Sequence, residues 1–282
     1  MTIEQVGVVG AGQMGNGIAQ VFAAAGFQVA LCDISSEALN RGMDSIRRSL
    51  ARLEEKHKIT AAEVEAILAR ISTAESLDAL SNVGLAVEAA TESEVLKHQI
   101  MRDLDRICPA GAILATNTSS ISITRIAAAT KRPEQVIGMH FMNPVPLMSL
   151  VELIRALQTG DETYQQVETL CRTLGKVPVE VKDGPGFVAN RILMPMINEA
   201  IYARFEGLAD AQGIDTVMKL GMNHPMGPLA LADLIGLDTC LAVMEVLHQG
   251  FGDSKYRPCP LLRQMVDAGY LGRKSGRGFY EY

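Results

Sequence analysis

The fold is decided by residues 6–15, Val6-Gly-Val-Val-Gly-Ala-Gly-Gln-Met-Gly15, where a short apolar run leads directly into three glycines. The run Val6–Val9 is typical of a strand that is buried on both faces of a parallel sheet. A helix of small residues is expected to follow, through Ala25, and then a second strand, Gln28–Cys32, which ends at Asp33. Strand, glycine turn, helix and strand make one βαβ unit, so the sequence predicts an α/β domain.

The three glycines have separate tasks in such a turn. Gly10 permits the tight bend, Gly12 lets the backbone approach a pyrophosphate, and Gly15 allows close packing of helix on strand. The pyrophosphate would rest on the helix N-terminus beside Gln13 and Met14, where amide donors favour negative charge. With its flanking strand, helix and acidic residue, the GxGxxG motif predicts a dinucleotide-binding, Rossmann-type domain.

Asp33 indicates which dinucleotide is bound. A carboxylate at the end of the second strand accepts hydrogen bonds from the ribose hydroxyls, which favours NAD. The following residues, Ile34, Ser35 and Ser36, include no arginine that could receive a 2′-phosphate. The alternative is that Asp33 only caps the next helix.

The rest of the chain divides into two parts. Residues 36–70 are expected to form an inserted pair of helices, the second one starting at the capping box Thr60-Ala-Ala-Glu63. Further strands are predicted at 86–88, 113–116, 136–140, 150–154 and 177–181. Turn residues at 182–186 mark a boundary, after which 187–206, 215–220, 228–249 and 259–268 have helical spacing. We expect a Rossmann-type domain with a helical hairpin insertion over 1–184 and an all-α domain for substrate binding and dimerisation over 185–282.

The composition excludes several classes of protein. The chain has 282 residues, 48% of them hydrophobic, with a net charge of −6, which argues against a nucleic-acid binder. Its five dispersed cysteines predict reduced thiols and no metal site. Because the first strand starts almost at Met1 and no apolar run is long enough to cross a membrane, we expect no targeting peptide, no membrane span and a cytoplasmic location.

A second segment, Gly138-Met-His140-Phe-Met-Asn143-Pro144, has the layout of an acid–base site. Histidine is suited to remove the hydroxyl proton of an alcohol near neutral pH. Glu152, on the next predicted strand, can orient the imidazole of His140 and stabilise its protonated form. Cofactor and base together predict the oxidation of an alcohol. Taken alone, a histidine at a strand end is more often a packed or solvated residue.

At this point the chain resembles the short-chain L-3-hydroxyacyl-CoA dehydrogenases, and more narrowly the bacterial 3-hydroxybutyryl-CoA dehydrogenases. The resemblance rests on the histidine segment through Glu152 and on Asp183-Gly-Pro-Gly-Phe-Val-Ala-Asn190-Arg191. Three further segments also fit: Asn117-Thr-Ser119-Ser120, Gly221-Met-Asn-His-Pro-Met-Gly-Pro228 and Lys274-Ser-Gly-Arg-Gly-Phe-Tyr280. Together these motifs extend over essentially the whole chain.

The resemblance implies a role for individual residues. His140 corresponds to the general base, Glu152 to its orienting carboxylate, Ser119 to a contact of the substrate 3-oxygen, and Asn190 to a contact near the thioester. The resemblance further implies cofactor contacts at Glu92, Lys97, Asn117, Ser119, Asn143 and Lys274, and coenzyme A contacts at Ser49 and Lys56.

Each of these residues also has a simpler explanation. Ser119 and Asn117 could shape a turn, Asn190 could cap a helix, and Lys97 could be solvated. The basic face formed by Arg47, Arg48, Arg52, Lys56 and Lys58 could be an ordinary solvated helix face, although a ligand with several phosphates needs a cationic site on an acidic protein.

The sequence therefore predicts NAD-dependent interconversion of (S)-3-hydroxyacyl-CoA and 3-oxoacyl-CoA, with 3-hydroxybutyryl-CoA and acetoacetyl-CoA preferred. One alternative is a 3-hydroxyacid dehydrogenase acting on free acids, whose GxxGxGxxxK motif is absent from this sequence. Another is a non-catalytic, crystallin-like relative. The apolar helices expected around 192–203 and 229–246 predict a homodimer.

Overall fold

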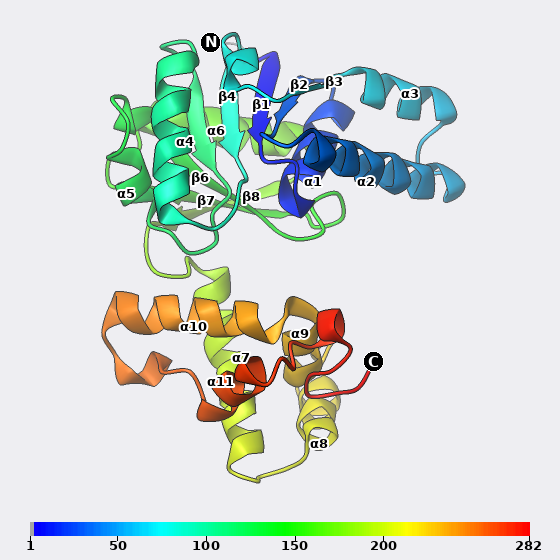
Figure 1. The fold of residues 1–282 in the computed structure, drawn as a ribbon, viewed down its shortest axis with the longest axis vertical. Helices are drawn as coiled ribbons and strands as arrows, with labels where there is room; N and C mark the ends of the chain where they lie inside the picture. Colours follow the sequence, from blue (N-terminus) through cyan, green and yellow to red (C-terminus); the bar gives the residue numbers. More distant parts are fainter. Residues whose placement is uncertain (1–2) are drawn as a thin grey trace. The chain divides into compact units, whose positions relative to one another are not determined.

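An eight-stranded sheet organises the first of two units into which the chain divides, Met1–Asp183 and Gly184–Tyr282. The computed structural model describes residues 3–282. The strand order is β3-β2-β1-β4-β5-β6-β7-β8 (Figure 1). The strands are β1 Gln5–Val9, β2 Gln28–Cys32, β3 Ile71–Ala74, β4 Leu85–Glu88, β5 Ile113–Thr116, β6 Val136–Phe141, β7 Leu150–Arg155 and β8 Val177–Lys182. The predicted α/β class is confirmed.

Neighbouring strands are parallel except for one pair. β7 runs antiparallel to β6, and this register sets His140 directly opposite Glu152. The carboxyl ends of β1, β2, β4, β5 and β6 therefore lie at one edge of the sheet. Ligands of open α/β sheets bind at this edge, where the loops after the strands converge.

Sequence analysis missed one strand of this sheet, β3. Its four residues, Ile-Ser-Thr-Ala, pair with β2 at the sheet edge, and only Ile71 is buried. The short segment therefore has no apolar run that would reveal it. β4 begins at Leu85, one residue before the predicted start.

Six helices accompany the sheet in the first unit. They are α1 Gln13–Ala24, α2 Ser36–Glu55, α3 Ala61–Ala69, α4 Glu94–Ile107, α5 Ile123–Ala127 and α6 Asp161–Thr173. α2 and α3 form the expected hairpin, which extends away from the sheet in Figure 1. The capping box between Thr60 and Glu63 is present, as predicted. Buried Val, Leu, Ile and Ala side chains from β1, β2, β4, β5 and β6 join α1 and α2 in one core.

The second unit is helical, as predicted. Its helices are α7 Ala189–Phe205, α8 Ala211–Thr216, α9 Pro228–Ile235, α10 Leu237–Phe251 and α11 Pro260–Asp267, with a π-helical turn at Val217–Gly221. They share a core of their own. The prediction of one helix over 228–249 is wrong. Gly236 has φ +103°, outside the helical region, and separates α9 from α10. The helix expected at 215–220 is also wrong in its bounds, because α8 starts at Ala211 under an Asp210 cap.

The cysteines, the potential metal ligands and the helix lengths can be described directly. Within residues 3–282, all five cysteines are buried and free, and no group of three or more His, Cys, Asp or Glu side chains could hold a metal ion. In the same range, no helix is both long and apolar enough to cross a membrane.

Candidate active site

The glycine loop has the geometry of a phosphate cradle. Gly10 has φ +100°, and a Cβ there would lie 2.7 Å from the carbonyl oxygen of Ala89. A Cβ on Gly15 would lie 1.7 Å from the oxygen of Gly10, so helix and turn pack too closely for any side chain. The Cβ direction of Gly12 opens into space. No side chain caps α1, and its first turn has no acidic residue, so its amides suit an anion.

Asp33 fastens this loop from the neighbouring strand. Its Oδ2 accepts a hydrogen bond of 2.8 Å from the amide of Ala11, and its Oδ1 accepts one of 3.0 Å from Ser35. The helix-cap alternative is wrong, because the cap of α2 is the Ser35 hydroxyl, which accepts from Ala38. Each carboxylate oxygen of Asp33 can still accept a ribose hydroxyl.

A cavity of about 360 Å³ opens beside the loop. Gly10, Gly12 and Asp33 line it together with the apolar side chains of Ile34, Leu77, Leu96 and Ile100. Glu75, which follows β3, also lines it. The cavity therefore joins an apolar wall, which suits a purine base, to a polar corner, which suits a ribose. These residues fit an adenine dinucleotide.

A buried ion pair joins Glu88, at the end of β4, to Lys97 on α4. The ammonium of Lys97 contacts both carboxylate oxygens of Glu88, at 2.8 and 3.0 Å, and the carbonyl of Ala90 at 3.2 Å. The side chain of Lys97 is 1% exposed and that of Glu88 is fully buried. The alternative that Lys97 is a solvated surface residue is therefore wrong.

Glu88 also fixes the backbone and side chains around it. Its Oε1 accepts from the amide of Ala90 at 2.6 Å, and its Oε2 accepts from the hydroxyl of Thr116 at 2.6 Å. The carboxylate thus ties the end of β4 to the end of β5 and to α4. Sequence analysis missed Glu88, although an acidic residue ending a buried strand was the available signal.

Glu92 continues the network to the loop that carries Ser119. Its Oε1 accepts from the Thr118 hydroxyl at 2.5 Å, from the Ser119 amide at 3.1 Å and from the Ser120 hydroxyl at 2.9 Å. Burial opposes ionisation of Glu92, but Lys97 and these hydrogen bonds outweigh it and hold its pKa below the ordinary value. Glu92 thus contacts both Lys97 and the backbone of Ser119, and the cofactor contacts implied for these residues stay predictions.

The two asparagines lie at the same edge of the sheet. Asn117, which is 8% exposed, accepts a 2.9 Å hydrogen bond from the amide of Phe141 and so links β5 to β6. Asn143 precedes a cis proline, Pro144, and its Oδ1 accepts a 3.2 Å bond from Gln13. The glycine loop, through Gln13, thereby contacts the segment after β6.

His140 and Glu152 form the predicted pair. Their side chains face each other across β6 and β7, with 2.8 Å between Nδ1 and Oε2. Both are buried, at 6% and 2% exposure. A carboxylate can only accept, so Nδ1 carries the proton in this contact, and Nε2 of the neutral ring is the basic nitrogen. An imidazole held in this tautomer suits acid–base catalysis.

The remaining predicted residues come from other elements of the chain. Ser49 and Lys56 lie on or just after α2, and Lys56 is exposed. Asn190 and Lys274 belong to the second unit. The Asn190 cap alternative is wrong, because Val188 holds the N-cap position of α7. The ammonium of Lys274 contacts Asp238 at 2.6 Å.

Comparison with known proteins identifies the family. Residues 5–184 match the NAD binding domain of 3-hydroxyacyl-CoA dehydrogenase, and residues 186–282 match its C-terminal domain. The chain belongs to the 3-hydroxyacyl-CoA dehydrogenase family. It is accordingly an NAD-dependent oxidoreductase.

Individual relatives are similar over the full length. A probable 3-hydroxybutyryl-CoA dehydrogenase of Bacillus subtilis is 58% identical over 282 residues, covering 100% of this chain and 98% of the relative. The 3-hydroxybutyryl-CoA dehydrogenase of Bradyrhizobium diazoefficiens is 55% identical, covering 99% and 96%. The crystal structure of (S)-3-hydroxybutyryl-CoA dehydrogenase from Ralstonia eutropha has a TM-score of 0.97 at 56% identity, covering 100% and 99%.

The buried pair predicts a stability test. Lys97→Met leaves the Glu88 carboxylate buried without its counter-charge, so we expect a loss of about 3–5 kcal/mol in the free energy of unfolding. The double variant Glu88→Gln/Lys97→Met removes both charges and should recover most of that loss. Arg106→Met removes an exposed partner of Asp103 on the same helix and should cost under about 1 kcal/mol. Denaturant unfolding followed by circular dichroism measures all three. If Lys97→Met lowers the free energy of unfolding by no more than Arg106→Met does, Lys97 and Glu88 do not act as a stabilising buried ion pair.

Proposed function

We propose that this enzyme interconverts (S)-3-hydroxybutyryl-CoA and acetoacetyl-CoA, and that His140 acts as its acid–base catalyst. The 2.8 Å contact between His140 and Glu152 is the observation that carries the proposal. It places an oriented imidazole at the sheet edge where the cradle of the cofactor also lies. The preference for a four-carbon acyl group is supported by the names of the relatives, which are 55–58% identical.

The reaction follows from the chemistry of the pair. In oxidation, Nε2 of His140 removes the hydroxyl proton as the C3–H bond breaks, and Glu152 stabilises the imidazolium that forms. NAD, when bound, supplies the acceptor for the two electrons and hydrogen that leave C3. In reduction, the imidazolium returns its proton to the 3-oxygen. The burial of both side chains keeps their contact out of competition with water.

The other residues would bind and orient the reactants. Ser119, whose amide is held by Glu92, would donate to the 3-oxygen, and Asn190 to the thioester end. Gly10, Gly12, Gln13, Met14, Gly15 and Asp33 would hold the adenosine and pyrophosphate. Glu92, Lys97, Asn117, Asn143 and Lys274 would contact or support the ribose and nicotinamide end. Ser49 and Lys56 would contact the coenzyme A portion of the substrate.

Quaternary structure and location are further parts of the proposal. The second unit exposes large apolar side chains, among them Ile192, Phe205, Leu208 and Leu220. Such surfaces are typical of interfaces, so we propose a homodimer joined through the second unit. Sedimentation equilibrium would test it, and a monomer at micromolar concentration would contradict it.

Five free thiols fit a reducing compartment, so we propose the cytoplasm, which cell fractionation would test.

Replacing the catalytic base tests the function directly. His140→Gln should bind NADH nearly as the wild type does, and its kcat for acetoacetyl-CoA-dependent NADH oxidation should fall by about 10²–10⁴-fold. Glu152→Gln should also lower kcat, because the imidazolium loses its counter-charge. Oxidation in the wild type should weaken at low pH, where the base is already protonated, and reduction should weaken at high pH. His98→Gln, on α4, is the control. Wild-type turnover by His140→Gln would refute the mechanism.

Cofactor choice tests Asp33. A 2′-phosphate would meet its carboxylate, and the exposed Glu75 adds a second negative charge to the same cavity, so NADH should be strongly preferred over NADPH. Asp33→Asn should bring kcat/KM with NADH closer to kcat/KM with NADPH, mainly by lowering the value with NADH. Glu75→Gln should reduce the preference for NADH over NADPH by a smaller factor. Equal kcat/KM values in the wild type would remove Asp33 from this role.

The proposed contact between Lys56, which follows α2, and the coenzyme A portion of the substrate can be tested by substitution. Lys56→Ala should raise KM for acetoacetyl-CoA several-fold and leave kcat nearly unchanged, because one exposed charge contributes about 0–1 kcal/mol. High ionic strength should mimic the variant, since screening weakens phosphate contacts. Free acetoacetate should react very poorly with either protein, because remote binding energy positions C3. Lys131→Ala, an exposed lysine outside the insertion, is the control. An unchanged KM and salt dependence would make Lys56 an ordinary surface residue.

A further inference from the structure

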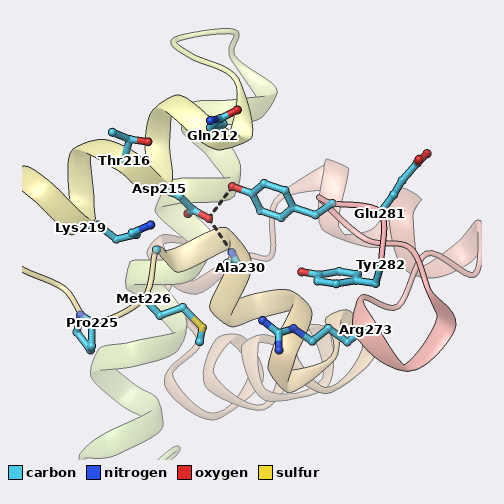
Figure 2. Close-up of a pocket in the computed structure, with 12 residues that line it drawn as sticks. Gln212, Asp215, Thr216, Lys219, Pro225, Met226, Ala230, Arg273, Glu281 and Tyr282 are labelled. Atoms are coloured by element: carbon cyan, nitrogen blue, oxygen red, sulfur yellow. Dashed lines mark hydrogen bonds between the residues drawn. The ribbon is translucent and has the colours of Figure 1, made fainter.

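Apart from Lys274, two sequence motifs have no part in the proposed reaction, and they meet in the second unit. Segment 221–228 and the segment that begins at Lys274 form opposite walls of a pocket of about 560 Å³ (Figure 2). Pro225 and Met226 come from the first segment, Arg273 and Tyr282 flank the second, and Lys219 follows α8. Every residue of the lining belongs to residues 212–282, so the second unit alone forms the pocket.

Asp215 fixes one wall of this pocket. Its carboxylate, on a residue only 5% exposed, accepts from the amides of Leu229 at 2.8 Å and Ala230 at 2.9 Å, in the first turn of α9. It also accepts from the Tyr280 hydroxyl at 2.7 Å. A Cβ on Gly227 would lie 2.2 Å from Cγ of Asp215. The Asp215 carboxylate thus accepts from the N-terminus of α9 and from a hydroxyl, which stabilises its charge without a cationic partner.

Asp233 fixes the other wall. It is 1% exposed and accepts from the amides of Phe279 and Tyr280, both at 3.0 Å, and from the Tyr282 hydroxyl at 3.1 Å. A Cβ on Gly278 would lie 2.0 Å from its Oδ1. The two buried carboxylates therefore hold the residues around the pocket in place before any ligand arrives.

Two cationic side chains, Lys219 and Arg273, line the pocket between these walls. Figure 2 shows the ammonium of Lys219 and the guanidinium of Arg273 directed into the pocket, with Glu281 directed away. Neither cation has a carboxylate partner within residues 3–282, whereas the adjacent Lys274 contacts Asp238. The guanidinium of Arg273 lies 5.2 Å from the centre of the Tyr282 ring, which holds it at the wall.

The backbone that carries Lys219 is unusual. Val217–Gly221 is a π-helical turn, and Asn223 just beyond it has φ +55°. π-Helical turns are rare and occur frequently at functional sites. Lys219 therefore lies on a type of backbone turn that is common at functional sites.

We propose that this pocket binds a small phosphorylated anion. Lys219 supplies a compact charge and Arg273 a planar fork of donors, the two side chains that proteins use to bind phosphate. Thr216 and Gln212 add a hydroxyl and an amide to the lining, and the ring of Tyr282 adds a flat apolar surface. A phosphate group between the two cations would neutralise charges that the protein leaves unpaired.

Direct binding tests the proposal without using turnover. Inorganic pyrophosphate is titrated by calorimetry into protein saturated with NAD, so that the glycine-loop cradle is filled, at constant ionic strength. The wild type should bind one pyrophosphate, and Lys219→Gln/Arg273→Gln should weaken binding at least about tenfold, which is a change of 1.4 kcal/mol. Lys255→Gln/Arg277→Gln is the matched control, because these cations also lie against tyrosine rings, of Tyr256 and Tyr270, outside the pocket. The control should bind as the wild type does.

Two further variants complete the design. If the double variant does not fold, as judged by circular dichroism, Lys219→Gln and Arg273→Lys alone should each weaken binding, the latter because lysine lacks the planar fork. Lys56→Gln should have no effect. The proposal is overturned if the wild type does not bind pyrophosphate, if the Lys219 and Arg273 variants bind it as the wild type does, or if Lys56→Gln abolishes binding, which would place the site on the inserted helices.

Discussion

The ammonium of Lys97 is buried away from water, and the groups that stabilise its positive charge also position the loops of the candidate active site. A buried cation without a partner would cost several kcal/mol, so the fold surrounds it with Glu88, Glu92 and the carbonyl of Ala90. Meeting that requirement also positions the chain. The same Glu88 carboxylate binds the amide of Ala90 and the hydroxyl of Thr116, and Glu92 binds the loop of Ser119. One buried charge therefore joins three successive elements, β4, α4 and β5.

The acid–base pair is held by a different means. Its two members face each other because β7 reverses direction beside β6, at the one antiparallel junction among the described strands. In an antiparallel ladder, directly opposite residues project to the same face and lie close together. A twelve-residue separation thus becomes a 2.8 Å contact whose geometry depends on strand pairing, because both residues lie within strands.

Sequence reasoning succeeded where a local pattern determines structure. The run from Val6 to Gly15, the capping box at Thr60 and the histidine segment each carry their own signal, and each has the expected local conformation. It failed where the outcome depends on distant partners. β3 is a strand only because the edge of β2 accepts it, and the burial of Lys97 follows from Glu88, nine residues earlier on another element. The break at Gly236 was missed because α9 and α10 form one continuous apolar pattern, and an isolated glycine within such a pattern can be tolerated inside a helix.

The way the second unit secures residues 279–282 affects the order in which the protein can fold during synthesis. Asp215 and Asp233 receive hydrogen bonds from Phe279, Tyr280 and Tyr282, which are all synthesised well after either aspartate. The sheet of the first unit needs none of these donors and can pack as soon as β8 has emerged. The helices around α9 must instead wait, with two carboxylates still hydrated, until those final donors arrive. The second unit therefore completes its core only after residues 279–282 have emerged, and until then its apolar faces are exposed to chaperones and to other nascent chains.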